Sequence, residues 1–327
     1  MPGSNSYVHV LLHSANGYDE RESGAEQCTE PFSIGDRLWL CRLSNELRDV
    51  VYKACAPQGE PYEKVYRQFG QLYTIALFVG PAQPGTVTGW DAFGEITKFV
   101  AYSQLTHPTS IGFGDTAVLE FNSVGDFVRA IPGPCRGITE IAFVVPPMRN
   151  WLSKSECETV KNLFFNSDFQ TLPDRIARAH WNLQHSAYQF FFEVRTMLVA
   201  SGLDAIVHVR KSANKAGGQR GPGTGKQFTA RTVKLANEVG VPCTEDDAWK
   251  FWDQRSDVAH GRDPWQSVRD PKNPKWKAPE LTRTDPMVQR YLTSEEILRR
   301  TVVKCLTDPQ FAAKFVSDDT VKSAYPV

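Results

Sequence analysis

The stretch of residues 174–202, DRIARAHWNLQHSAYQFFFEVRTMLVASG, decides the fold class of the C-terminal half. Apolar residues recur along it at helical spacing, and the run from Tyr188 to Val199 is apolar on nearly every side. A helix with apolar residues all round is usually a buried one. We therefore predict a single long central helix here, with shorter helices packed around it.

The residues that follow predict further helices. We expect one over residues 229–239 and one that begins at Thr244, where TEDD supplies an N-cap and an acidic first turn. That helix should stop near Gly261. Another should begin at residues 293–294 and run through ILRRTVVKCL, with a short helix at PQFAAKF. The second half is thus predicted to be all-α.

The first half has a different texture. A helix is expected from Ser44, within LSNELRDVVYKAC. Gly/Pro-rich connectors separate short β-like runs, at residues 7–12, 37–41, 72–79, 117–121 and 138–145. The fold class is therefore α+β, with a mixed α/β domain over residues 1–168 and an all-α helical bundle over residues 169–327.

Composition sets limits on the function. The chain has 327 residues, with 37 Lys+Arg against 37 Asp+Glu, which excludes a wholesale polycation or an acidic tail. No stretch approaches the about 18 apolar residues that a membrane-spanning helix needs. The seven cysteines are scattered, with no CxxC pair and no Cys/His cluster at zinc spacing. We expect a cytoplasmic chain with no membrane contact, no signal peptide, no metal site and no cofactor.

Charge is divided unevenly between the halves. Residues 1–150 have a balance of −5 and residues 151–327 a balance of +5. Within residues 205–234 there are seven basic residues and no acidic one: Arg210, Lys211, Lys215, Arg220, Lys226, Arg231 and Lys234. Such a run suits a phosphate backbone, and we expect Lys226, Arg231 and the more distant Arg262 to contact nucleic acid. The alternative is a solvated connection between helices.

The peptide Arg255-Ser256-Asp257-Val258-Ala259-His260-Gly261 is the strongest candidate for chemistry. Arg…His pairs at similar spacing also occur inside residues 174–202, but only this pair ends a predicted helix just before a glycine. Five residues along a helix turn the two side chains apart by roughly 140°. They would then converge only on a groove that wraps the helix, such as one closed by a second subunit. The alternative is a C-cap histidine with the arginine in a surface ion pair.

The C-terminal half resembles the HEPN domain family, of the ApeA-like type found in prokaryotic defence and toxin–antitoxin settings. The resemblance covers about residues 170–320. It rests on FFFEVRTMLVASGLDAI, KQFTARTVKLANEVGVPCTEDD, WDQRSDVAHGR and ILRRTVVKCLTDPQFAAKF, in that order. HEPN domains have an Arg-x4–6-His motif, which Arg255 and His260 match. The residue after the arginine is often Asn, Asp or His in the family, and here it is Ser256.

The resemblance implies metal-independent cleavage of RNA by a homodimer formed through the helical domain. The residue types agree with this chemistry, because RNA carries its own nucleophile, the 2′-OH. A histidine can move the protons, and an arginine can hold the phosphate and stabilise its charge. The expected product ends in a 2′,3′-cyclic phosphate, and DNA would not be cut. Arg255, His260 and Ser256 are thus the candidate catalytic residues.

Two alternatives to the nuclease stay open. The helical half could be a catalytically silent HEPN module that binds RNA or protein and dimerises, or a purely structural bundle. If the chain is a nuclease, we expect the N-terminal domain to sense a trigger or to select the target. We also expect a partner protein that triggers or neutralises the nuclease.

Overall fold

The computed structural model describes residues 5–13, 32–34, 38–42, 74–79, 88–109, 116–123, 126–131, 152–189, 192–210, 223–260 and 286–327. The chain divides into two compact units. The first comprises residues 1–144 and 148–166, and the second comprises residues 145–147 and 167–327. The expected boundary, after residue 168, lies two residues beyond the end of the first unit.

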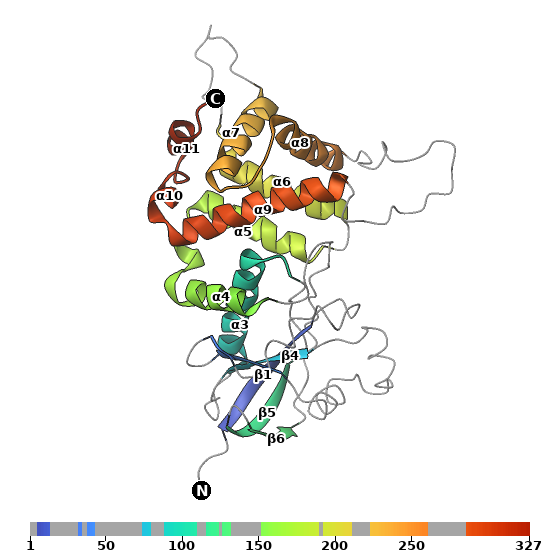
Figure 1. Ribbon diagram of the computed structural model, residues 1–327, viewed down its shortest axis with the longest axis vertical. Helices are drawn as coiled ribbons and strands as arrows, with labels where there is room; N and C mark the ends of the chain where they lie inside the picture. Colours follow the sequence, from blue (N-terminus) through green and yellow to red (C-terminus); the bar gives the residue numbers. More distant parts are fainter. Residues whose placement is uncertain are drawn as a thin grey trace, which may run out of the picture. The chain divides into compact units, whose positions relative to one another are not determined.

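The first unit contains an antiparallel sheet in the strand order β2-β3-β4-β1-β5-β6. Figure 1 labels four of these strands, β1, β4, β5 and β6. Its strands are β1 (Asn5–His13), β2 (Phe32–Ser33), β3 (Leu38–Arg42), β4 (Thr74–Val79), β5 (Thr116–Ser123) and β6 (Asp126–Ile131). Strand β1 lies at the centre, where Val10 pairs with Leu77 of β4 and Val8 with Val118 of β5. Four of the five predicted strands match β1, β3, β4 and β5.

Two helices accompany this sheet. Helix α3 (Thr88–Thr106) contacts both β1 and α4 (Lys154–Asn166). The buried side chains of α3 include Phe99 and Tyr102, and those of α4 include Val160. The sequence did not lead us to expect either helix. The helix expected from Ser44 and the strand expected at residues 138–145 lie outside the described residues.

The second unit is helical throughout its described length (Figure 1). It begins with a 3-10 turn, η2 (Phe169–Thr171). Its helices are α5 (Asp174–Ala187), α6 (Phe192–Val207), α7 (Thr224–Glu238), α8 (Glu245–Ala259), α9 (Pro286–Thr307), α10 (Pro309–Ala313) and α11 (Asp318–Ala324). The described chain is mostly helical and is consistent with the α+β class: its strands lie in the first unit, and the described part of the second unit has helices alone.

The single long helix predicted for residues 174–202 is wrong. The stretch forms two helices, and α6 folds back on α5, so that the Arg175 guanidinium near the start of α5 donates to the Ala205 carbonyl oxygen near the end of α6. Gly202 allows close packing, because a Cβ atom there would lie 2.7 Å from Cδ2 of Leu298 on α9. Two shorter helices can both pack against α9, whereas one long helix would leave much of its apolar surface exposed to solvent.

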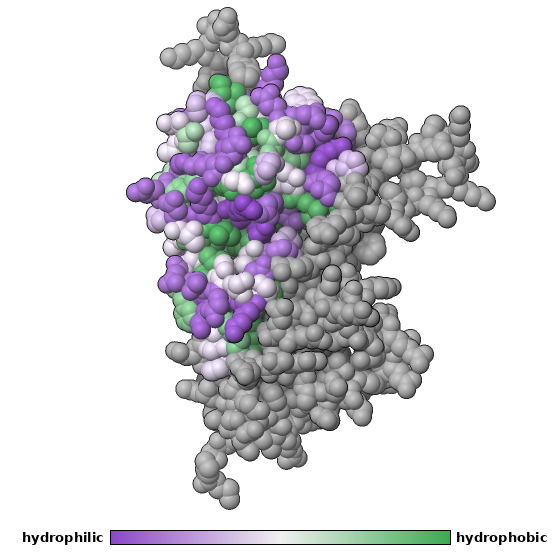
Figure 2. Space-filling model, in the orientation of Figure 1, coloured by the Kyte–Doolittle hydropathy of each residue, from purple (hydrophilic) through white to green (hydrophobic). Residues whose placement is uncertain are grey.

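The remaining helix predictions are confirmed with shifted limits. Helix α8 begins after Thr244, which forms a capping box with Asp247, and it ends at Ala259. Helix α7 begins five residues before the predicted start, and α9 begins at Pro286 rather than near Thr293. Much of the surface shown in Figure 2 is hydrophilic over these helices, as expected for a bundle whose apolar residues face inward.

Candidate active site

The C-terminal end of α8 carries the three candidate catalytic residues. Arg255 and Ser256 are half-buried in its last turns, and His260 is the exposed C-cap residue. The His260 N–H donates to the carbonyl oxygens of Ser256, at 3.0 Å, and Asp257, at 3.2 Å. This fixes the backbone of His260 at the helix end while its imidazole remains on the surface.

Arg255 makes contacts within its own helix and with α6. One guanidinium nitrogen lies 3.3 Å from a carboxylate oxygen of Asp204, near the end of α6. The guanidinium carbon lies 4.9 Å from the ring centre of Trp252, a cation–π contact. The side chains of Arg255 and Asp204 are 29% and 17% exposed, so this ion pair joins two helices in a partly desolvated place. The arginine is therefore held by two partners and still reaches solvent.

Asp204 and His208 are functional candidates that the sequence reasoning missed. The Nδ1 atom of His208 lies 3.7 Å from the second carboxylate oxygen of Asp204, and the His208 side chain is 44% exposed. Asp204 thus stands between the imidazole of His208, which follows the last residue of α6, and a guanidinium from α8. An Asp-x3-His spacing at the end of an apolar helix, just before the basic run, was the available signal in the sequence.

The start of α7 packs on the same part of α8. A Cβ atom at Gly225 would lie 3.0 Å from atoms of both Trp249 and Trp252, so only glycine allows this approach without displacing the indoles. The rings of Phe228 and Trp252 have their centres 5.3 Å apart. Lys226, the next residue after Gly225, is exposed. Trp252 therefore connects the helix turn that carries Lys226 to the guanidinium of Arg255.

Arg231 does not suit the nucleic-acid role that we expected for it. It is 5% exposed and donates to the carbonyl oxygens of Tyr325, at 3.1 Å, and Val207, at 3.3 Å, and to Oε1 of Gln227 at 3.1 Å. Its guanidinium fastens the C-terminal residues to α7 and to the end of α6. The buried Arg231 guanidinium is therefore not available to bind RNA. Arg262 lies outside the described residues.

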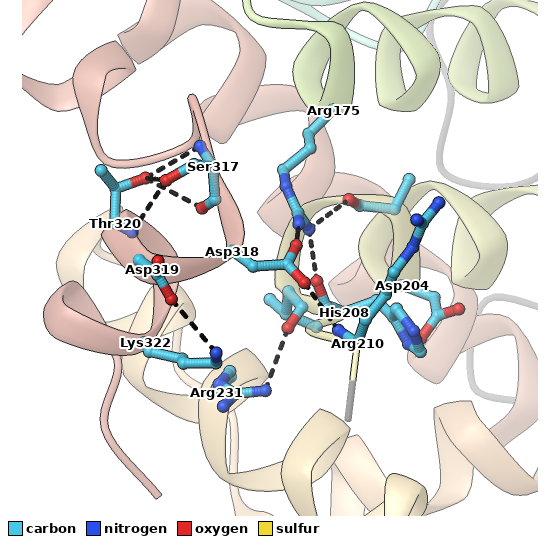
Figure 3. A network of polar contacts seen from close by, with 12 residues as sticks. Arg175, Asp204, His208, Arg210, Arg231, Ser317, Asp318, Asp319, Thr320 and Lys322 are labelled. Atoms are coloured by element: carbon cyan, nitrogen blue, oxygen red, sulfur yellow. Dashed lines mark hydrogen bonds and ion pairs between the residues drawn. The ribbon is translucent and has the colours of Figure 1, made fainter. Parts of the chain in front are cut away.

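A basic cluster lies beside the end of α6 (Figure 3). Arg175 donates to the His208 carbonyl oxygen and forms an ion pair with Asp318, and the backbone N–H of Arg210 donates to the same carboxylate at 2.8 Å. Burial lowers the pKa of Arg175, and the positive charges of Arg178, Arg210 and Arg231 lower it further. One guanidinium and one backbone N–H thus share the Asp318 carboxylate, and the basic residues around Arg175 give this surface a positive potential that favours an anion.

No protein-family model, no curated protein and no solved structure matches this chain. Within the described ranges, no helix has both the length and the apolar character needed to cross a bilayer. The same residues bring together no group of three or more His, Cys, Asp or Glu side chains that could hold a metal ion.

Proposed function

We propose that the helical unit is a HEPN-type domain that cleaves RNA as a homodimer without a metal ion. The observation that carries this proposal is the end of α8, where Arg255 is held by Asp204 and Trp252 and His260 caps the helix at the surface. An arginine fixed in this way can bind a phosphate with the donors that Asp204 does not use. An exposed imidazole close by in sequence can move a proton during cleavage.

The roles follow from the chemistry of the RNA backbone. The 2′-oxygen attacks the adjacent phosphorus, the bond from phosphorus to the 5′-oxygen breaks, and a 2′,3′-cyclic phosphate remains. Arg255 stabilises the charge on the phosphate oxygens, and His260 transfers a proton in the same step. Ser256, beside Arg255, supplies a hydroxyl that can donate to a phosphate oxygen. Lys226 contacts the RNA backbone, and Arg262 follows the motif in sequence.

Two exposed tryptophans support a homodimer formed through the helical unit. Trp181 on α5 is 56% exposed and Trp249 on α8 is 45% exposed. Large aromatic side chains are enriched at protein interfaces. In the cell we place the protein in the cytoplasm, in a prokaryotic defence or toxin-like response, with the first unit sensing a trigger or selecting the RNA.

The Arg255–Asp204 ion pair also favours a second candidate, a catalytically silent module that binds RNA or protein and dimerises. An arginine neutralised by a carboxylate has less charge to offer a phosphate. The two functions differ in one outcome. The silent module binds RNA in a salt-dependent manner but leaves it intact.

The test is incubation of a mixed RNA pool with purified full-length protein in excess EDTA. Wild-type protein should produce 2′,3′-cyclic phosphate ends, and His260→Ala and Arg255→Ala should each reduce them by about 100-fold or more. His185→Ala, which removes an exposed histidine from α5, is the matched control and should cleave like the wild type. Intact RNA with a folded wild-type dimer would reject the nuclease and favour the silent module. Equal cleavage by wild type and His260→Ala would reject the site.

A further inference from the structure

The carboxylate of Asp204 holds groups from two helices in one site. Oδ2 lies 3.3 Å from a guanidinium nitrogen of Arg255, and Oδ1 lies 3.7 Å from Nδ1 of His208. Oδ1 is buried and has no hydrogen-bond partner within the described part of the chain. A buried acceptor left unpaired destabilises the fold. A small rotation of the His208 imidazole, which brings an Nδ1–H into hydrogen-bond range, removes this penalty.

A hydrogen bond formed by this rotation would fix which ring nitrogen carries the proton. When Nδ1 carries the proton and donates to Asp204, Nε2 of neutral His208 has a free lone pair. The His208 side chain is 44% exposed, so the imidazole is open to solvent and to a substrate. A carboxylate that orients a histidine in this way leaves the other ring nitrogen ready to accept a proton. The arrangement is that of a general base.

The surroundings of His208 attract a phosphate. Arg255 shares the Asp204 carboxylate. Arg175 donates to the carbonyl oxygen of His208, and Arg210 follows two residues later (Figure 3). Arg255 pairs with Asp204 and Arg175 pairs with Asp318, so the charge of Arg210 is left over as a net positive charge. A scissile phosphate bound by Arg255 would therefore lie next to an oriented imidazole within a region of positive charge.

We propose that His208 is a second catalytic residue of the site, the base that removes the 2′-OH proton, and that Asp204 is its positioning residue. This inference rests on the RNA cleavage proposed above. Cleavage needs two proton transfers, one from the 2′-oxygen and one to the 5′-oxygen, and one imidazole cannot make both at once. His208 Nε2 takes the first proton as the 2′-oxygen bonds to phosphorus. The bond to the 5′-oxygen breaks, and this oxygen takes its proton from the protonated imidazole of His260.

The test separates the base from the acid with two substrates. One is an RNA oligonucleotide, and the other is the same oligonucleotide with sulfur in place of the bridging 5′-oxygen at the scissile bond. A thiolate leaves without a proton, so the sulfur substrate needs the base but not the acid. The proteins are full-length wild type, His208→Ala, His260→Ala, Asp204→Asn and the control His185→Ala.

We expect His208→Ala and His260→Ala each to slow cleavage of the ordinary substrate by about 10²–10⁴-fold. The sulfur substrate should restore near wild-type rates to His260→Ala and leave His208→Ala slow. Asp204→Asn should slow cleavage of both substrates relative to the control, because it removes the carboxylate that orients the His208 imidazole and holds the Arg255 guanidinium. Because a structural role of His208 would also leave His208→Ala slow on both substrates, added imidazole is the second readout. It should restore cleavage by folded His208→Ala if the variant lacks only its base, and an absence of restoration would reject His208 as the base.

Three further results would overturn the inference, and they can be told apart. If His208→Ala cleaves as fast as the control His185→Ala while His260→Ala is inactive, His208 is not the base, and the proposed nuclease still stands. Rescue of His208→Ala by the sulfur substrate makes it the acid and rejects its role as base. Failure of folded wild type to cleave either substrate rejects both the inference and the nuclease. If His208→Ala unfolds, His208→Gln gives the same comparison, because its amide can still donate to Asp204.

Discussion

Replacing His180 with phenylalanine should make the helical unit less sensitive to acid. His180 is 8% exposed, and its ring stacks on Phe169 with the ring centres 4.2 Å apart. Its Nε2 atom has no hydrogen-bond partner among the described residues. Burial lowers the pKa of His180 from 6.5 to about 4, because a charged imidazole there would lose its hydration.

The direction of the effect follows from proton binding. Below pH 6.5 the unfolded chain binds a proton at this imidazole, and the folded chain does not bind it until the pH nears 4. The free energy of unfolding therefore decreases as the pH is lowered from 6.5 to about 4. A pKa difference of this size corresponds to roughly 3 kcal/mol between pH 7 and pH 4. Carboxyl groups with lowered pKa values, Glu238 and Asp247, add losses of their own at acid pH, in wild type and variant alike.

Urea unfolding at pH 7 and pH 4 measures this difference. His180→Phe keeps an aromatic ring on Phe169 and removes the titrating group. From pH 7 to pH 4, the decrease in its unfolding free energy should therefore be smaller than the decrease in the wild type by roughly 3 kcal/mol. His185→Phe controls for the loss of a histidine from the same helix, because that side chain is exposed. An equal fall in wild type and His180→Phe would refute the assignment of acid sensitivity to the buried imidazole.

Three further changes test the packing and the charges of the helical unit. Gly202→Ala should lower the unfolding free energy by about 1 kcal/mol, because overpacking against Leu298 outweighs the better helix propensity of alanine. The control is Gly94→Ala, which has no atom within 4 Å of the new Cβ and should not destabilise α3. Arg231→Met should cost about 3 kcal/mol in urea unfolding and expose the C-terminal residues to proteases, since it removes the donor from three acceptors; wild-type protection would contradict this. Lys226→Ala should weaken RNA binding and reduce the slope of log affinity against log salt by about one; an unchanged slope would remove Lys226 from the interface.

Helix ends with a local chemical cause were predicted well from the sequence. Thr244 and Asp247 cap α8 through their own side chains, and the glycine after His260 marks its other end. The break between α5 and α6 has no such signal, because Tyr188 caps α5 with backbone hydrogen bonds and no glycine or proline lies there. Packing of α6 back onto α5 decides it, and periodicity along one segment does not reveal packing against another.

The candidate site divides in the same way. Arg255 and His260 lie in one short peptide, so their spacing could be found in the sequence. Asp204 reaches Arg255 only because α6 and α8 pack together, and 51 positions of sequence separate the two residues. The role of Arg231 was misjudged for a related reason. A run without acidic residues predicts positive charge. The Arg231 guanidinium instead donates to backbone carbonyls at the end of α6 and near the C-terminus, which composition cannot reveal.

The most direct test of the central claim is cleavage of one RNA oligonucleotide in EDTA by wild-type protein, beside the same oligonucleotide with a single 2′-deoxy sugar at the cleaved position. If Arg255 and His260 serve a 2′-OH nucleophile, the all-RNA strand is cut to a 2′,3′-cyclic phosphate, and the 2′-deoxy strand is not cut at that position. Cleavage of both strands at the same bond would contradict the account, because the nucleophile would then come from elsewhere. Survival of both strands with a folded dimer would equally contradict it.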